Sequence, residues 1–292
     1  MAKNFGLHFW LTAWNFDPSI WLGSLLIIGL YLYGIGPLRK KYQLGEPVKP
    51  GKIILFLAGV LVIFFALSSP LDALGDDYLF SAHMAQHMLL SLAGPPLMLA
   101  GLPGWLVSPL LRNKVIYRIA KALTIPIVAF FLFNFDIWIW HAPAIYDLAL
   151  ANDTVHFFEH ITFLVTGFIF WWPILSPAPE LPPLQVGGRI LYIFLSDMPM
   201  VLLGAGLTFT PPLYTPYIEQ TVRVYGLSAA TDQQLGGLMM WVPGSILFIV
   251  IMSLLFIQWM RLLDARQRER DAELFGDEEV SAEESEIAEQ HS

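Results

Sequence analysis

The sequence predicts an all-α, polytopic membrane protein with seven transmembrane helices, on the basis of three observations. Only 14% of the 292 residues are charged and 56% are hydrophobic, whereas an average soluble domain has about 25% charged residues. Seven apolar runs of roughly 17 or more residues are each long enough to cross a hydrocarbon layer about 30 Å thick. The loops between these runs alternate between basic and non-basic.

The apolar runs define the predicted helices to within a few residues. Their predicted bounds are 19–36, 53–69, 79–102, 123–140, 156–175, 190–208 and 235–260. The first run is not typical of a cleaved signal peptide, because three consecutive basic residues from Arg39 follow it. Pro95, Pro96 and Pro199 lie inside the third and sixth runs and predict kinks, which free backbone carbonyls for polar neighbours.

The basic residues predict the orientation of the chain. Fourteen of the sixteen Lys and Arg residues lie on one side of the predicted membrane: between the first and second runs, between the third and fourth, between the fifth and sixth, and after the seventh. Lys3 and Arg223 lie on the other side. The positive-inside rule therefore places the N-terminus outside and the C-terminus in the cytoplasm. We expect a multi-pass protein of the bacterial cytoplasmic (inner) membrane.

The C-terminal segment differs in composition from the rest of the chain. Eleven acidic residues lie between Asp264 and the end, and they dominate the net charge of −8. Such a segment has too little apolar surface to fold alone. We therefore expect a transmembrane domain over residues 1–260 and a disordered, acidic cytoplasmic tail over 261–292. The chain shows no phosphate-binding loop and no basic stripe, so we expect no nucleic-acid partner.

Five histidines fall in the outer half of the predicted membrane domain. They lie in the first turns of the third helix, at the end of the fourth and in the first turns of the fifth: His83, His87, His141, His156 and His160. The first two and the last two form i,i+4 pairs, which occupy one helix face. Isolated membrane histidines are often explained by hydrogen bonds between helices. Two such pairs at one depth instead predict a metal site.

The other residue types narrow the choice of metal. The chain has no cysteine, which excludes thiolate sites and iron–sulfur clusters. Methionines accompany the histidines in the third helix and near the outer end of the seventh, and thioether with imidazole favours copper, especially cuprous copper. Ordinary packing remains the alternative for each methionine. The candidate soft ligands, or partners of the ligands, are Met84, Met88, Met239, Glu159, Asp136 and Asp232.

Two other kinds of site remain open. The string His156-Phe-Phe-Glu159-His160 matches the H-x-x-E-H pattern of inverted zinc proteases. It would suit a zinc-dependent membrane hydrolase with Glu159 or Asp136 as general base. Haem held between His87 and His160, in a membrane electron carrier, is the second alternative.

Several strings together resemble the polytopic CtaG family of cytochrome c oxidase assembly factors. In chain order they begin at His83 (HMAQHMLL), Trp140 (WHAP), His156 (HFFEH), Trp171 (WWP) and Asp232 (DQQLGG). The resemblance implies a non-enzymatic role in maturing a haem–copper oxidase, with an oxidase subunit as partner. It also implies that copper is supplied to, or inserted into, the haem–copper centre of that oxidase.

Overall fold

The computed structural model describes residues 5–290 of the chain, with side chains as far as residue 272. Throughout this part of the chain the regular secondary structure is helical, which confirms the all-α prediction. Five helices are long and apolar enough to cross a membrane, and two bent helix pairs raise the number of candidate spans to seven. The structure thus supports a multi-pass membrane protein with five to seven spans.

The five continuous candidate spans correspond to five of the predicted helices. Their bounds are Pro18–Tyr42 (α2 with η1 and α3), Pro50–Ser68 (α4), Asp153–Leu175 (α12), Val186–Phe209 (α13) and Ala229–Ala272 (within α15). α15 itself runs on to Gln290, through the acidic segment. Disorder of this segment stays a prediction, and Lys3 and the last two residues lie outside the described part.

The third and fourth predicted helices each correspond to the longer member of a bent pair. In the third, α6 (Phe80–Met88), the π-helical η2 (Leu89–Ala93) and α7 (Gly94–Gly101) run on to a 95° bend before α8 (Gly104–Leu111). In the fourth, α9 (Lys114–Leu123) meets α10 (Pro126–Trp140) at 68°. α8, α9 and other short helices at the ends of the bundle were not predicted. The others are α1 (Leu7–Thr12), α5 (Pro70–Asp77), α11 (Pro143–Ala151), α14 (Thr215–Glu219) and η3 (Val224–Gly226).

A proline follows the π-helical segment of the third span and frees a backbone carbonyl within it. Pro95 has no backbone N–H and leaves the carbonyl of Ser91, four residues earlier, without its helical donor. The indole N–H of the buried Trp171 on α12 donates to this carbonyl at 3.1 Å. A polar neighbour thus satisfies the group that the proline frees, as a membrane interior requires.

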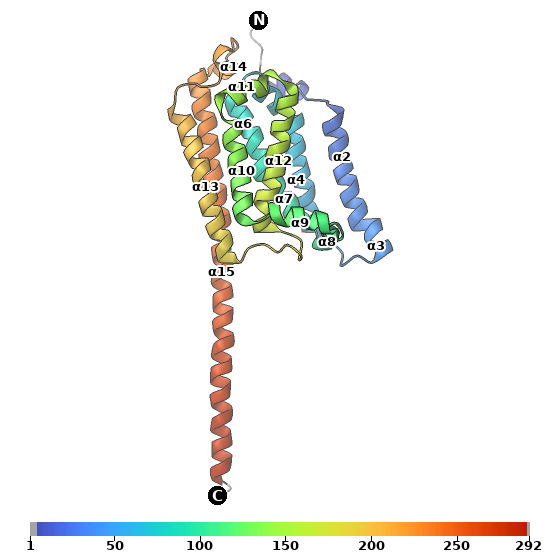
Figure 1. Ribbon diagram of the computed structural model, residues 1–292, viewed down its shortest axis with the longest axis vertical. Coiled ribbons are helices and arrows are strands. Elements are labelled where there is room, and N and C mark those ends of the chain that lie inside the picture. Colours follow the sequence, from blue (N-terminus) through green and yellow to red (C-terminus); the bar gives the residue numbers. More distant parts are fainter. Residues whose placement is uncertain (1–4, 291–292) are drawn as a thin grey trace.

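The helices form one bundle, with α13 and α15 packed along one side and α2 at the opposite edge (Figure 1). The main hydrophobic core lies between α6, α7, α10, α12, α13 and α15, and includes Phe133, Phe170, Trp171 and Phe248. α3, α8 and α9 lie at one end of the bundle, and α11 and α14 lie at the other, with the N-terminus (Figure 1). The basic segments of α3 and α9 therefore lie at the end opposite to the N-terminus.

Candidate metal centre

Six side chains from three helices meet near the end of the bundle that carries the N-terminus. They are Asp76 from α5, His83 and His87 from α6, and His156, Glu159 and His160 from α12. The two i,i+4 histidine pairs face each other across the helix contact. The ring centroids of His83 and His156 lie 5.3 Å apart, and those of His87 and His160 lie 5.6 Å apart.

Two carboxylates lie between these imidazoles. Glu159 places one oxygen 3.6 Å from Nε2 of His87 and the other 3.8 Å from Nε2 of His83. Asp76 Oδ1 lies 3.7 Å from Nδ1 of His83 and 3.6 Å from Nε2 of His156. These separations are too long for hydrogen bonds. They are close to the ~3.4 Å that separates two ligand atoms placed about 2.1 Å from a tetrahedral ion.

Nine buried polar atoms of this cluster have no hydrogen-bond partner. Ten buried side-chain nitrogen and oxygen atoms in the described part of the chain lack a partner, and nine belong to these six residues. Buried polar atoms are normally satisfied, because leaving them unpaired is costly. Nitrogen and carboxylate oxygen are ligands of divalent transition metals. The cluster therefore has the donor set and the unmet bonding capacity that a metal ion would use.

Two overlapping groups of three ligands have the spacing for an ion. One consists of His83, His156 and His160, and the other of His83, His87 and Glu159; in each, the three ligand atoms lie within 4.8 Å of one another. His83, which is fully buried, belongs to both. The residues present thus fit a metal ion.

Asp76 and Asp72 lie on the same short helix but have different partners. Asp72 accepts from the side-chain amides of Gln86 at 2.7 Å and Asn15 at 3.0 Å, so both of its oxygens are occupied. Asp76 is 31% exposed, yet its Oδ1 is buried and unpartnered. Burial, and then the negative charges of Asp72 and other nearby carboxylates, raise the pKa of Asp76 to about 9. A bound cation would offset this cost of negative charge.

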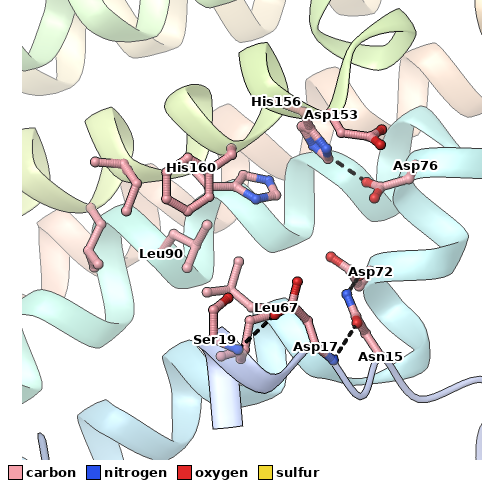
Figure 2. Close-up of a pocket in the computed structure, with 14 residues that line it drawn as sticks. Asn15, Asp17, Ser19, Leu67, Asp72, Asp76, Leu90, Asp153, His156 and His160 are labelled. Atoms are coloured by element: carbon pink, nitrogen blue, oxygen red, sulfur yellow. Dashed lines mark hydrogen bonds and ion pairs between the residues drawn. The ribbon is translucent and has the colours of Figure 1, made fainter. Parts of the chain in front are cut away.

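A cavity of about 380 Å³ leads to the cluster from one side. Figure 2 shows His156 and His160 along one wall, with Asp76 paired to His156 and with Asp72, Asp17 and Asn15 on other sides of the space. Asp153 also lines it. An acidic cavity of this kind concentrates cations at its mouth, so it is a suitable route for a metal ion to reach His156 and His160.

The remaining predicted ligands lie around the cluster rather than within it. His141 follows α10, and its ring centroid is 6.3 Å from that of His87. Its Nε2 lies 3.1 Å from the sulfur of Met84. Met88 is half-buried on α6; on α15 Met239 is half-buried, whereas its neighbour Met240 is buried.

The two predicted aspartates bind other partners. Asp136 accepts from Thr166 at 2.8 Å and from Trp140 at 3.0 Å. Asp232, in the first turn of α15, accepts from the backbone N–H groups of Phe80 and Ser81 and from the Ser81 hydroxyl. Asp232 therefore caps the start of α6 and helps to position the helix that carries His83 and His87.

Asp76 is a candidate ligand that the sequence alone does not indicate. Asp76 precedes His83 by seven residues but belongs to a separate helix, and only the packing of α5 on α6 brings them together. Gly75 permits this contact, because a Cβ at this position would stand 2.9 Å from Cα of His83, and no pattern in the sequence indicates it. The sequence alone likewise does not indicate Met200, on α13.

The fold and the histidine–carboxylate cluster together define the class of this protein: a multi-pass helical membrane protein with a candidate metal centre near one end of its bundle. The sequence model of the cytochrome c oxidase caa3 assembly factor family (Caa3_CtaG) matches residues 29–262, and the chain belongs to this family. The match confirms the resemblance and covers every residue of the cluster.

Similar curated proteins occur in mycobacteria. The uncharacterized proteins Mb0105 of Mycobacterium bovis and MT0111 of Mycobacterium tuberculosis are each 28% identical over 93% of this chain. The uncharacterized protein ML1998 of Mycobacterium leprae is 26% identical over 86% of it. The chain spans less than half the length of these relatives, at 43%, 43% and 40%. No solved structure matches the chain.

Proposed function

We propose that this protein is a non-enzymatic assembly factor that binds copper at the histidine–carboxylate cluster and aids its insertion into a haem–copper oxidase. The observation that carries the proposal is the convergence of nine unpartnered, buried ligand atoms from six side chains. Family membership connects the chain with the assembly of cytochrome c oxidase. An oxidase subunit is then the partner, and copper is the cargo rather than a permanent cofactor.

The orientation of the protein completes the proposal. We place it in the bacterial cytoplasmic membrane with the N-terminus outside, because the basic segments lie on α3, α9 and the extension of α15. The cluster then lies in the outer half of the membrane, and the acidic cavity admits copper from the outer side. This depth suits transfer to a partner within the bilayer.

The ligands suit a metal that must be released again. Copper binds nitrogen and oxygen ligands more tightly than the other first-row divalent metals, so it is a strong guest for this site. Two overlapping ligand groups share His83. A shared ligand allows stepwise exchange, in which one bond forms as another breaks.

A zinc-dependent hydrolase and a haem-binding electron carrier are the two alternatives to this proposal. Zinc also accepts three imidazoles and a carboxylate as ligands. Haem is less compatible with the packing, because the rings of His83 and Phe163 lie 4.1 and 4.3 Å from that of His87. An optical spectrum and elemental analysis of the purified protein separate these cases. A Soret band indicates haem, and zinc without copper supports the hydrolase.

The proposal is tested in cells by replacing single histidines. We expect His83→Ala and His160→Ala to leave insertion of the protein intact, because removing a polar group makes a span easier to insert. The partner oxidase should retain haem but lack copper at its haem–copper centre. His8→Ala, on the exposed surface of α1, is the matched control. A deletion strain with normal oxidase copper and activity under copper-limited growth would refute the proposal.

A further inference from the structure

A second group of metal-binding side chains lies directly beneath the cluster. It surrounds an internal cavity of about 20 Å³, which is the size needed for one water molecule or ion. The six potential ligands that line this cavity are Met84, His87, Met88, His141, Met200 and Met240. Four thioethers and two imidazoles from four parts of the chain therefore meet at one point. We call this group the methionine pocket.

The pocket lies inside the bundle and not on its lipid-facing surface. Met84 is 1% exposed, and Met200 and Met240 are each 4% exposed. They come from α6, α13 and α15, three helices that are remote in sequence. No carboxylate lines this cavity, in contrast to the cluster above it. The ligand set is consequently soft and uncharged.

The contact between His141 and Met84 is the most informative feature of the pocket. Nδ1 of His141 lies 2.7 Å from the carbonyl oxygen of Ile137, and this oxygen only accepts, so Nδ1 carries the proton. In a neutral ring, Nε2 then presents a lone pair to the sulfur of Met84, 3.1 Å away. The sulfur is itself a weak acceptor. Two lone pairs facing each other in the interior have no favourable interaction without a cation between them.

The distance between these two atoms suits a shared ion. Bonds of about 2.0 Å to an imidazole nitrogen and about 2.3 Å to a sulfur give an angle of about 90° at the metal when the two ligand atoms are 3.1 Å apart. A second proton, on Nε2 of His141, is the alternative occupant of the space between this nitrogen and the sulfur of Met84. It would place a charge in a pocket that no carboxylate lines, which is costly.

Two glycines of α15 provide the room for the thioethers. A Cβ at Gly244 would stand 2.7 Å from the terminal methyl of Met200 and 3.8 Å from that of Met88. A Cβ at Gly236 would stand 3.2 Å from Cγ of Met84. The last helix therefore approaches α6 and α13 closely enough to enclose the methionines because both positions lack a side chain.

We infer that the methionine pocket is a second metal site, specific for cuprous copper, with Met84, Met200, Met240 and His141 as its ligands. Thioether and imidazole ligands without negative charge favour Cu(I) over divalent metals. His87 lies between the two sites, since it lines this pocket and also faces Glu159 at 3.6 Å. As a store or relay for copper, the pocket rests on the proposed function; as a Cu(I) site, it stands on its own geometry.

The test uses the full-length protein in detergent, loaded anaerobically with Cu(I). We expect X-ray absorption at the copper edge to show sulfur ligands at about 2.3 Å. The triple variant Met84→Leu, Met200→Leu, Met240→Leu conserves volume. It should lower the sulfur signal, to which only Met88 of the pocket can then contribute, and bind Cu(I) about tenfold or more weakly in competition with a chromogenic Cu(I) chelator. Its affinity for Co(II), as a probe of the cluster, should not change.

Adjacent methionines supply the matched control. Met198 and Met239 lie next to the pocket residues in sequence, but neither lines the cavity, so Met198→Leu with Met239→Leu should bind Cu(I) as the wild type does. A wild-type spectrum with only nitrogen and oxygen ligands would overturn the inference, whether or not the triple variant folds. So would unchanged Cu(I) affinity in the triple variant.

The two sites are separated by a further variant. His156→Ala with His160→Ala should weaken Co(II) binding at the cluster, where His83, His87 and Glu159 remain as ligands, while the Cu(I)–sulfur signal persists. If this variant still binds Co(II) normally, the cluster proposal fails while the methionine pocket is judged on its own spectrum. If the cluster binds Co(II) but wild-type Cu(I) shows no sulfur, the pocket fails alone.

Discussion

Gly75 of α5 lies so close to His83 of α6 that a Cβ on the glycine would stand 2.9 Å from the histidine Cα. Only a residue without a side chain lets the two helices approach this closely. The approach places the next residue, Asp76, 3.7 Å from Nδ1 of His83. The glycine thus determines whether the carboxylate from α5 reaches the histidines of α6 and α12.

The first prediction follows from this contact. Gly75→Ala should push α5 away from α6, withdraw Asp76 and weaken metal binding by about tenfold or more. Co(II) titration of the purified protein measures the change. Gly29→Ala is the control, because a Cβ at Gly29 meets no atom within 4 Å. This helical position should tolerate alanine or gain up to about 1 kcal/mol of stability. Equal metal affinity in both variants would contradict the prediction.

A second prediction separates the two aspartates of α5. Asp76→Asn should weaken metal binding about 10- to 100-fold with little change in stability, because it removes a charged ligand and no hydrogen bond. Asp72→Asn should instead destabilise the fold by about 1–3 kcal/mol. The NH₂ group of the new side chain would face the NH₂ group of Asn15 or Gln86, so two donors would meet where a donor now meets an acceptor. Thermal unfolding and metal titration of both variants test this. Asp77→Asn, at an exposed position, should change both quantities less, because Asp77 acts on Asp72 and Asp76 only through its charge.

The third prediction concerns the π-helical segment. Trp171→Phe removes the donor to the Ser91 carbonyl and should lower the free energy of unfolding by about 1–3 kcal/mol. In the Trp171→Phe background, Pro95→Ala should lower the free energy of unfolding less than it does in the wild type. The substitution restores a backbone N–H that can donate to the Ser91 carbonyl in place of the lost indole. A double-mutant cycle measures this coupling. Strict additivity of the two substitutions would show that the indole does not act through the Ser91 carbonyl.

The fourth prediction concerns topology. Reporter fusions at Tyr42, Asn113 and Arg268 should be cytoplasmic, because they follow or adjoin the basic segments. Fusions at Asp76, Asp153 and Glu219 should be exported. Alkaline phosphatase and a cytoplasm-active fluorescent protein report the two locations. A consistently inverted pattern would place the cluster on the cytoplasmic side and remove the proposed route for copper from outside.

Sequence patterns were sufficient for the features that depend on local composition. Apolar runs long enough to span a membrane predicted each of the candidate spans, because in lipid the length and polarity of a segment largely decide its conformation. The i,i+4 spacing placed His83 with His87, and His156 with His160, on single helix faces, because helical periodicity fixes these neighbours. The family resemblance rested on the same short strings and was confirmed.

Features that depend on contacts between remote segments appeared only in the tertiary structure. Two predicted spans each belong to a bent pair of helices, and the last helix does not end at residue 260. Asp232 caps α6 across 151 residues of sequence, and Asp76 reaches His83 only because Gly75 allows the close approach. The choice of Met240 over Met239 for the methionine pocket depends on the rotation of α15 about its own axis. Sequence determined which residues are available at each depth of the membrane, whereas helix packing decided which of them meet, because contact depends on the facing surfaces of helices distant in the chain.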